Sequence, residues 1–126
     1  MAVIALFVGS TRRDRQGIKV ARWMWEKLTA REHIVHFIDP LELNLPLFNR
    51  MYKEMKNPPR VLRDLRNKIK NAEGYLAVTP EYNHSTSAAV KNTLDYFLEE
   101  YFFKPSAIVS YSAVALVDLI LLNIYI

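Results

Sequence analysis

Four short, largely apolar runs along the chain predict β-strands. They cover residues 2–8, 33–38, 75–79 and 107–111, and the first of them reads AVIALFV without interruption. Continuous apolar runs rich in β-branched and aromatic residues are typical of strands that are buried on both faces of a sheet.

Three segments between these runs place apolar residues at helical spacing instead. The predicted helices are residues 17–31, a stretch that Pro59 opens and Gly74 closes, and residues 87–102. Gly74 stands where a left-handed helix cap needs a glycine. The residues of the last helix that are expected to face inward are Val90, Leu94, Phe97 and Leu98. Residues 41–48 contain a proline and are predicted to be irregular.

The predicted order is therefore strand, helix, strand, helix, strand, helix, strand. Such alternation favours a doubly wound parallel sheet with helices on both faces, because right-handed crossovers leave few other topologies. We expect one domain over residues 1–126, since a chain of 126 residues can bury one hydrophobic core.

Composition excludes several kinds of chemistry. The chain has no cysteine, so disulfides, thiolate catalysis and cysteine-based zinc sites are excluded. His33 and His36 lie three apart in a predicted strand and point to opposite faces, and His84 stands alone, so we expect no metal site. Nothing at the amino terminus resembles a signal peptide, which makes a cytoplasmic location the expectation.

The net charge of +4 is concentrated in two basic segments, residues 12–22 and 53–70. A mild positive balance suits anionic cofactors, nucleic acid or a solvated surface. The first segment has no interleaved aromatic residues, so we expect no nucleic-acid partner.

Residues 9–15, which read GSTRRDR, follow the first predicted strand and precede a helix. A strand-to-helix turn supplies backbone N–H groups and the positive end of the helix dipole to an anion. Ser10 adds a hydroxyl donor, and Arg12 or Arg15 can bind phosphate oxygens in a fork. The segment is neither a Walker loop nor a dinucleotide fingerprint, and a polar turn remains the plainer interpretation.

Residues 79–85, which read TPEYNHS, follow the third predicted strand. In open α/β sheets, ligands bind outside the carboxyl ends of the strands, which is where both loops are predicted to lie. One loop suits a phosphate and the other carries an aromatic residue, so the pair predicts a flat phosphorylated cofactor. Each of these residues also has a plainer interpretation. Tyr82 could be an ordinary edge aromatic, and Asn83 and Ser85 could simply form a turn. Lys91 and Asp95 could form a surface ion pair. Asn92 is expected to hold the backbone of this second loop rather than to contact a substrate.

Taken together, three segments resemble the NAD(P)H-dependent FMN reductase family, which includes flavin-dependent quinone and azo reductases. They are GSTR at residues 9–12 with Arg15, PEYN at residues 80–83, and Lys91-Asn92. The resemblance runs from residue 1 to about residue 112. It implies a flavodoxin-like fold, FMN as cofactor, NAD(P)H as electron donor and a small-molecule acceptor, namely a quinone, an azo compound or free flavin. It also implies a homodimer or homotetramer and no catalytic acid or base. We expect no membrane span, because the apolar stretch of residues 114–126 is too short to cross a bilayer as a helix.

The resemblance further implies which residues hold the cofactor. Ser10, Arg12 and Arg15 match positions that hold the FMN phosphate, and the second loop matches the segment that lies along the isoalloxazine ring. The implied cofactor-binding residues are Ser10, Arg12, Arg15, Pro80, Glu81, Tyr82, Asn83 and Ser112.

The chain departs from the family after Ser112. Family members have a glycine-rich loop there, whereas residues 113–126 form an apolar tail without glycine. We expect the last strand and helix of the fold to be missing or replaced, which leaves two functional interpretations. One is an active FMN-dependent oxidoreductase, and the alternative is a flavin- or nucleotide-binding protein that has lost turnover.

Overall fold

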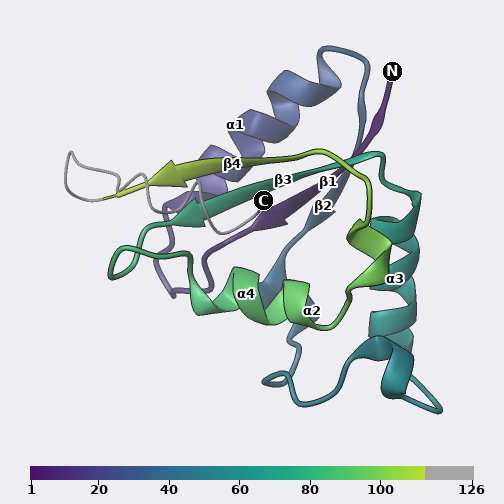
Figure 1. The fold of residues 1–126 in the computed structure, drawn as a ribbon. Helices are drawn as coiled ribbons and strands as arrows, with labels where there is room; N and C mark the ends of the chain where they lie inside the picture. Colours follow the sequence, from purple (N-terminus) through teal and green to yellow (C-terminus); the bar gives the residue numbers. More distant parts are fainter. Residues whose placement is uncertain (113–126) are drawn as a thin grey trace.

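A parallel sheet with helices on both faces is the framework of the computed structural model, which describes residues 1–112 (Figure 1). In chain order the elements are β1 (Val3–Val8), α1 (Gly17–Thr29), β2 (Ile34–Ile38), α2 (Pro40–Leu43), the 3-10 helix η1 (Tyr52–Glu54), α3 (Arg60–Asn71), β3 (Gly74–Pro80), α4 (Ala88–Asp95), the 3-10 helix η2 (Glu99–Tyr101) and β4 (Ser106–Tyr111). The strand order is β2-β1-β3-β4, and every adjacent pair is parallel. The predicted flavodoxin-like α/β architecture is confirmed.

The pleat of β1 divides the core into two layers. Ala5 and Phe7 pack with residues of α3 and α4, whereas Leu6 and Val8 pack on the other face with Ala21 of α1. Figure 1 shows α1 on one side of the sheet and α3 and α4 on the other. The uninterrupted apolar run of β1 is therefore explained by burial on both faces.

The register of the strands brings their carboxyl ends to one edge. Val8 of β1 pairs with Val78 of β3, and Pro80 of β3 pairs with Tyr111 of β4. The segments that leave β1, β3 and β4 therefore start side by side, which is the arrangement a ligand site at this edge requires.

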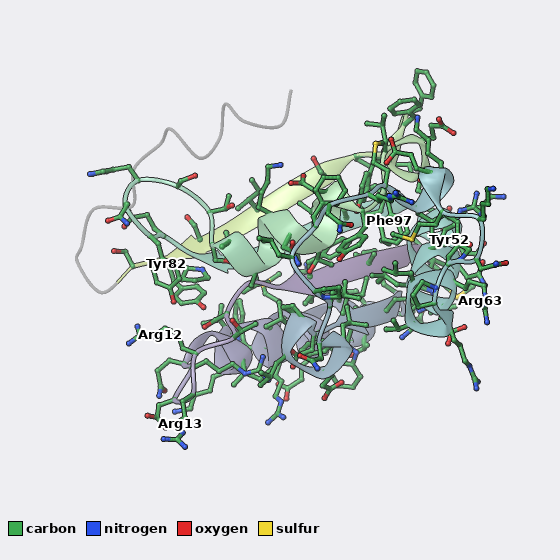
Figure 2. All side chains as sticks on the ribbon, turned by 90° about the horizontal axis from the view of Figure 1, so that it is seen from below. Arg12, Arg13, Tyr52, Arg63, Tyr82 and Phe97 are labelled. Atoms are coloured by element: carbon green, nitrogen blue, oxygen red, sulfur yellow. The ribbon has the colours of Figure 1, made fainter. Side chains whose placement is uncertain are left out.

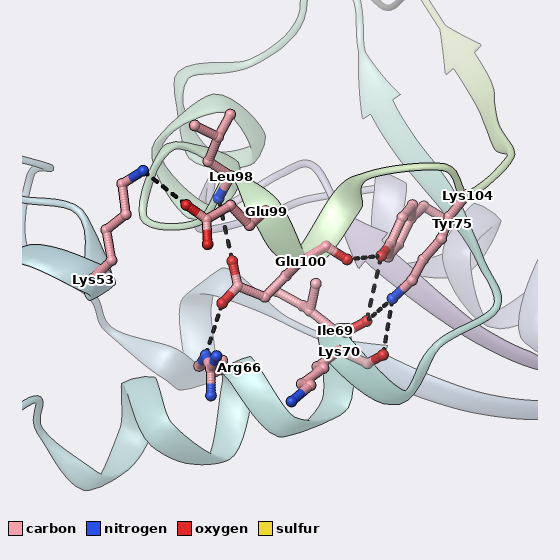
Figure 3. Close-up of polar contacts among 9 residues, drawn as sticks. All are labelled: Lys53, Arg66, Ile69, Lys70, Tyr75, Leu98, Glu99, Glu100 and Lys104. Atoms are coloured by element: carbon pink, nitrogen blue, oxygen red, sulfur yellow. Dashed lines mark hydrogen bonds and ion pairs between the residues drawn. The ribbon is translucent and has the colours of Figure 1, made fainter.

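The prediction for Gly74 is wrong. Gly74 does not have a positive φ and instead begins β3, where it pairs with Ile4. Helix α3 ends at Asn71, the C-cap residue Ala72 is already extended, and the Glu73 N–H bonds to the Val3 carbonyl at 2.7 Å. Lys104 donates to the Ile69 and Lys70 carbonyl oxygens, at 3.2 and 2.8 Å, so a side chain takes the place of a glycine cap (Figure 3).

The predicted helix over residues 87–102 is also too long. Helix α4 ends at Asp95, and Leu98, which was expected to face inward, is 44% exposed. The cause is tertiary: the Glu100 carboxylate accepts from Arg66 at 2.7 Å, and the Glu100 carbonyl accepts from the Tyr75 hydroxyl at 2.6 Å (Figure 3). These bonds draw the chain toward α3 and β3. Burial raises the pKa of Glu100, but the hydrogen bonds from Arg66 and from backbone donors outweigh it, so that its pKa is lowered.

Smaller differences concern residues near the surface. Part of the segment predicted to be irregular forms the short helix α2, whose N-cap is Asp39. Trp25, which was expected on the apolar stripe of α1, is 40% exposed. Within residues 1–112, no helix has the length and apolarity needed to cross a bilayer. The predictions made for residues 113–126 fall outside the described residues.

Candidate functional site

A cavity of about 830 Å³ opens at the carboxyl edge of the sheet. Its walls come from the first loop (residues 9–16), the second loop together with the end of β3 from which it leaves (residues 79–87), and the end of β4. The lining includes every residue predicted from the sequence: Ser10, Arg12, Arg15, Pro80, Glu81, Tyr82, Asn83 and Ser112. Asp14, Gln16, Gly17 and Tyr111 also line it. Arg12 and Tyr82 lie at the same end of the molecule in Figure 2.

The two loops are bonded to each other at their roots. The Gly9 N–H donates to the Val78 carbonyl at 2.7 Å, and the Ser87 hydroxyl donates to the Gly9 carbonyl oxygen. A side chain at residue 9 would place its Cβ 2.6 Å from the Cα of Thr79, so only glycine permits this approach. The Thr79 hydroxyl accepts from the Ser87 N–H at 3.2 Å and completes the junction.

Arg15 of the first loop is engaged within the protein. Its Nη1 and Nη2 donate to the two carboxylate oxygens of Asp39 at 2.7 and 2.6 Å, and Nη1 also donates to the Ser10 carbonyl at 3.0 Å. The Arg15 side chain is 13% exposed and the Asp39 side chain is 3% exposed. The hydrogen bond with Asp39 raises the pKa of Arg15 despite the opposing effect of burial.

Arg12, in contrast, carries an exposed guanidinium at the cavity. Among residues 1–112, no acceptor receives the backbone N–H of Thr11 or of Arg12. Free N–H groups in a turn that precedes a helix form a concavity suited to an anion. Asp14 at the same cavity opposes this potential in part.

The second loop contains a tight two-residue turn. Tyr82 and Ser85 exchange N–H to carbonyl bonds of 3.0 and 3.1 Å, and Asn83 and His84 between them have φ values of 51° and 63°. Positive φ at both central residues is typical of a type I′ turn, which asparagine tolerates better than most residues. The Glu81 carboxylate accepts from the His84 N–H at 2.6 Å and from the Ser112 hydroxyl at 3.1 Å, which fixes the turn against β4. Tyr82 remains 38% exposed at the cavity.

Tyr111 was not predicted as a site residue. Its ring lies against Gly17 at the start of α1, where a Cβ on Gly17 would come within 1.7 Å of the tyrosine oxygen. That oxygen is buried, and no atom of residues 1–112 makes a hydrogen bond with it. Burial raises the pKa of Tyr111, and the nearby Ser10 hydroxyl opposes the rise without reaching hydrogen-bond geometry.

Helix α4 carries three residues that were singled out from the sequence, Lys91, Asn92 and Asp95. Asn92 does not hold the second loop, as was expected, but the segment between α2 and η1: its Oδ1 accepts from the Phe48 N–H at 2.7 Å and its Nδ2 donates to the Pro46 carbonyl at 3.0 Å. Lys91 and Asp95 form a surface ion pair, which was the plainer of the two interpretations of these residues.

Sequence reasoning missed Asp39, Ser87 as the link between the loops, and Tyr111. Asp39 and Tyr111 stand at the ends of predicted strands, so the rule that parallel strands end at one edge contained a signal for both. The partner of each side chain, however, depends on distances between separate elements. The assembled site offers donors and positive charge on one wall and an aromatic side chain on the other, which suits a flat ligand with an anionic group.

Comparison with known proteins agrees with this geometry. A family model described as NADPH-dependent FMN reductase matches residues 1–118. An NAD(P)H-dependent FMN reductase from Nectria sp. is 35% identical over 120 residues, which cover 88% of this chain and 60% of that protein. A quinone reductase from Pseudomonas putida is 33% identical over 114 residues, covering 86% of this chain and 59% of that protein. The chain thus spans about 60% of the length of these relatives.

Solved structures show the same arrangement. FerB from Paracoccus denitrificans, a flavoenzyme NAD(P)H:(acceptor) oxidoreductase, superposes with a TM-score of 0.69 at 27% identity and covers 87% of this chain and 60% of its own. The apo form of an NADH:FMN oxidoreductase superposes with a TM-score of 0.73 over 91% of this chain and 60% of its own, and at 20% identity it shows the fold alone.

Proposed function

Because this chain belongs to the NADPH-dependent FMN reductase family, we propose that it is an FMN-dependent NAD(P)H oxidoreductase. The observation that carries the proposal is the single cavity that the first and second loops share. Its volume of about 830 Å³ lies within the range typical of cofactor sites, roughly 300–1,000 Å³. The Tyr111 hydroxyl, which has no hydrogen-bond partner among the described residues, also suits a site built for a polar ligand.

We assign the phosphate end of FMN to the first loop. Arg12 supplies the exposed positive charge and Ser10 supplies a hydroxyl. The N–H groups of Thr11 and Arg12, which bond to no acceptor among residues 1–112, supply further donors. Arg15 belongs to the same wall, where it is engaged with Asp39.

We assign the isoalloxazine ring to the second loop. Pro80, Glu81, Tyr82 and Asn83 form this wall, and Ser112 is bonded to it through Glu81. The type I′ turn fixes the exposed Tyr82 next to backbone groups that can face a planar ring. Bound FMN would accept hydride from NAD(P)H and deliver it to an acceptor, while the protein residues bind and orient.

The acceptor that we propose is a quinone, an azo compound or free flavin. Relatives carry the names quinone reductase and NADPH azoreductase, and the azoreductase from Bacillus sp. is 36% identical over 67 residues. The second loop presents an aromatic and an amide side chain at an open cavity, which suits flat acceptors that stack. We also propose that the protein forms a homodimer or homotetramer, because Trp23 and Phe103 are exposed aromatic side chains suited to a subunit interface. A cytoplasmic location is part of the same proposal.

Titration of the purified protein with FMN tests the proposal, with flavin fluorescence as the readout. We expect saturable quenching, and Arg12→Gln should weaken FMN binding about tenfold, which is typical of losing a charge-assisted hydrogen bond. Arg13→Gln is the matched control, because Arg13 is the neighbouring exposed arginine outside the cavity lining and should change affinity less than about twofold. No quenching by the wild-type protein would overturn FMN binding.

Oxidation of NADPH in the presence of FMN and a quinone then separates an active enzyme from a flavin-binding protein without turnover. The expected result is quinone-dependent loss of NADPH absorbance that Arg12→Gln diminishes in parallel with FMN affinity. Binding of FMN without any NADPH oxidation would leave cofactor binding standing and reject the reductase activity.

A further inference from the structure

We propose that Arg15 and Asp39 form a positioning pair that shapes the first loop, and that neither side chain contacts the cofactor phosphate. The inference rests on the proposed function, because it divides roles among residues of the proposed FMN site. It assigns Arg15 a role different from that of Arg12, although both are arginines of one loop at one cavity.

The geometry shows what occupies Arg15. Three of the five N–H donors of its guanidinium are engaged, two by Asp39 and one by the Ser10 carbonyl. Asp39 is itself fixed, because its Oδ1 also accepts from the Leu41 N–H at 3.0 Å and thereby caps α2. The first loop is therefore tied to the end of β2 through a bidentate contact in which Asp39 is buried and Arg15 is partly buried.

This tie determines where the donors of the loop point. A trans peptide directs its carbonyl and the following N–H in opposite directions. Arg15 holds the Ser10 carbonyl, so the Thr11 N–H points away from Arg15. The Arg15 N–H in turn donates to the Arg12 carbonyl at 3.3 Å, which closes the turn around the free N–H groups of Thr11 and Arg12. The pair thus organises donors that it does not itself provide.

If Asp39 acted only through its charge, its substitution would change FMN affinity in the opposite direction from that expected of a positioning residue. A carboxylate near a phosphate repels it, so removing the negative charge should strengthen FMN binding if electrostatics were the main contribution of Asp39. If Asp39 instead holds Arg15 and the loop in place, its removal should weaken FMN binding. The sign of one substitution therefore separates the two roles.

The test compares the affinities of wild type, Asp39→Asn and Arg15→Lys for FMN and for riboflavin, which lacks the phosphate. We expect both substitutions to weaken FMN binding about tenfold and riboflavin binding less than threefold. Lysine at position 15 should not restore FMN affinity, because its ammonium cannot bond both Asp39 oxygens and the Ser10 carbonyl as the planar guanidinium of Arg15 does. Unchanged or tighter FMN binding by Asp39→Asn would overturn the proposal, and so would full FMN affinity in Arg15→Lys.

A second variant excludes a merely structural role. Breaking one side of a buried ion pair destabilises a fold, whereas replacing both partners with apolar residues is often neutral. Arg15→Met combined with Asp39→Leu should therefore lower the thermal midpoint of the apo protein by only the few degrees that loss of the α2 N-cap costs, and it should keep riboflavin affinity. FMN affinity should nevertheless fall about tenfold. If this double variant bound FMN as tightly as the wild type, the positioning role would be rejected and the proposed function would stand. If the wild-type protein itself did not bind FMN, the proposed function would be rejected as well.

Discussion

The hydroxyl of Ser87 donates to the carbonyl oxygen of Gly9, and this bond joins two loops that are 78 positions apart in the chain. Ser87 is also the N-cap of α4, where its oxygen accepts from the Val90 N–H at 3.3 Å. One side chain thus begins a helix and holds the cavity walls together.

Ser87→Ala should destabilise the protein by about 2–3 kcal/mol. The loss combines a helix cap, about 1 kcal/mol, with a buried carbonyl left without its donor, about 1–2 kcal/mol. Urea unfolding followed by circular dichroism measures it. Lys91→Ala, which breaks an exposed ion pair on the same helix, is the control and should cost less than about 0.5 kcal/mol. Equal effects of the two substitutions would contradict the role of Ser87.

Substitution of Gly9 and of Gly74 by alanine should change the stability of the protein by very different amounts. Gly9→Ala should destabilise the protein by about 2 kcal/mol or more, because its Cβ would overlap the Thr79 backbone at 2.6 Å, where nothing flexible can yield. At Gly74 the nearest contact of an added Cβ is 3.4 Å from the Pro105 carbonyl oxygen, an ordinary packing distance. Gly74→Ala should therefore be tolerated within about 0.5 kcal/mol. Thermal unfolding of the two variants would decide, and comparable midpoints would show that the loops do not approach this closely.

Tyr111→Phe should stabilise the apo protein by about 1 kcal/mol. Its buried oxygen has no partner among the described residues, and removing an unsatisfied buried hydroxyl relieves a desolvation cost. The ring that packs on Gly17 is kept. Differential scanning calorimetry without flavin provides the measurement, and a clear loss of stability would mean that the hydroxyl has a partner in solution.

Tyr75 predicts a dependence on alkaline pH. Burial, with a smaller effect from Glu100, raises the pKa of Tyr75 to about 12, above its ordinary value near 10 in the unfolded chain. Its contribution to stability is therefore fully present below pH 10 and is lost as the pH rises from about 10 to about 12. The hydroxyl donates to the Glu100 carbonyl at 2.6 Å, so Tyr75→Phe should cost about 1 kcal/mol near neutral pH.

The difference in unfolding free energy between wild type and Tyr75→Phe, measured in urea at several pH values, isolates this group. It should shrink between pH 10 and pH 12. A difference that stayed constant over that interval would show that the phenol titrates normally in the folded state.

The fold and the place of the site followed from local patterns, whereas individual partners did not. The apolar runs predicted β1 to β4, and the turn residues after β1 and β3 predicted the cavity, because both signals lie within short stretches of sequence. The end of α4 was missed because Glu100 bonds to Arg66 and Tyr75 on other elements. The engagement of Arg15 was missed for the same reason, since Asp39 lies 24 positions away.

The cavity lies at one edge of the sheet, and the exposed Met1 lies beyond the other end of β1. Attachment to a sensor surface through the amino terminus would therefore leave the cavity mouth facing the solution. The chain has no cysteine, so a thiol introduced at Arg13, next to the cavity residue Arg12, would be a unique labelling position. A dye there could report flavin arrival directly, one molecule at a time.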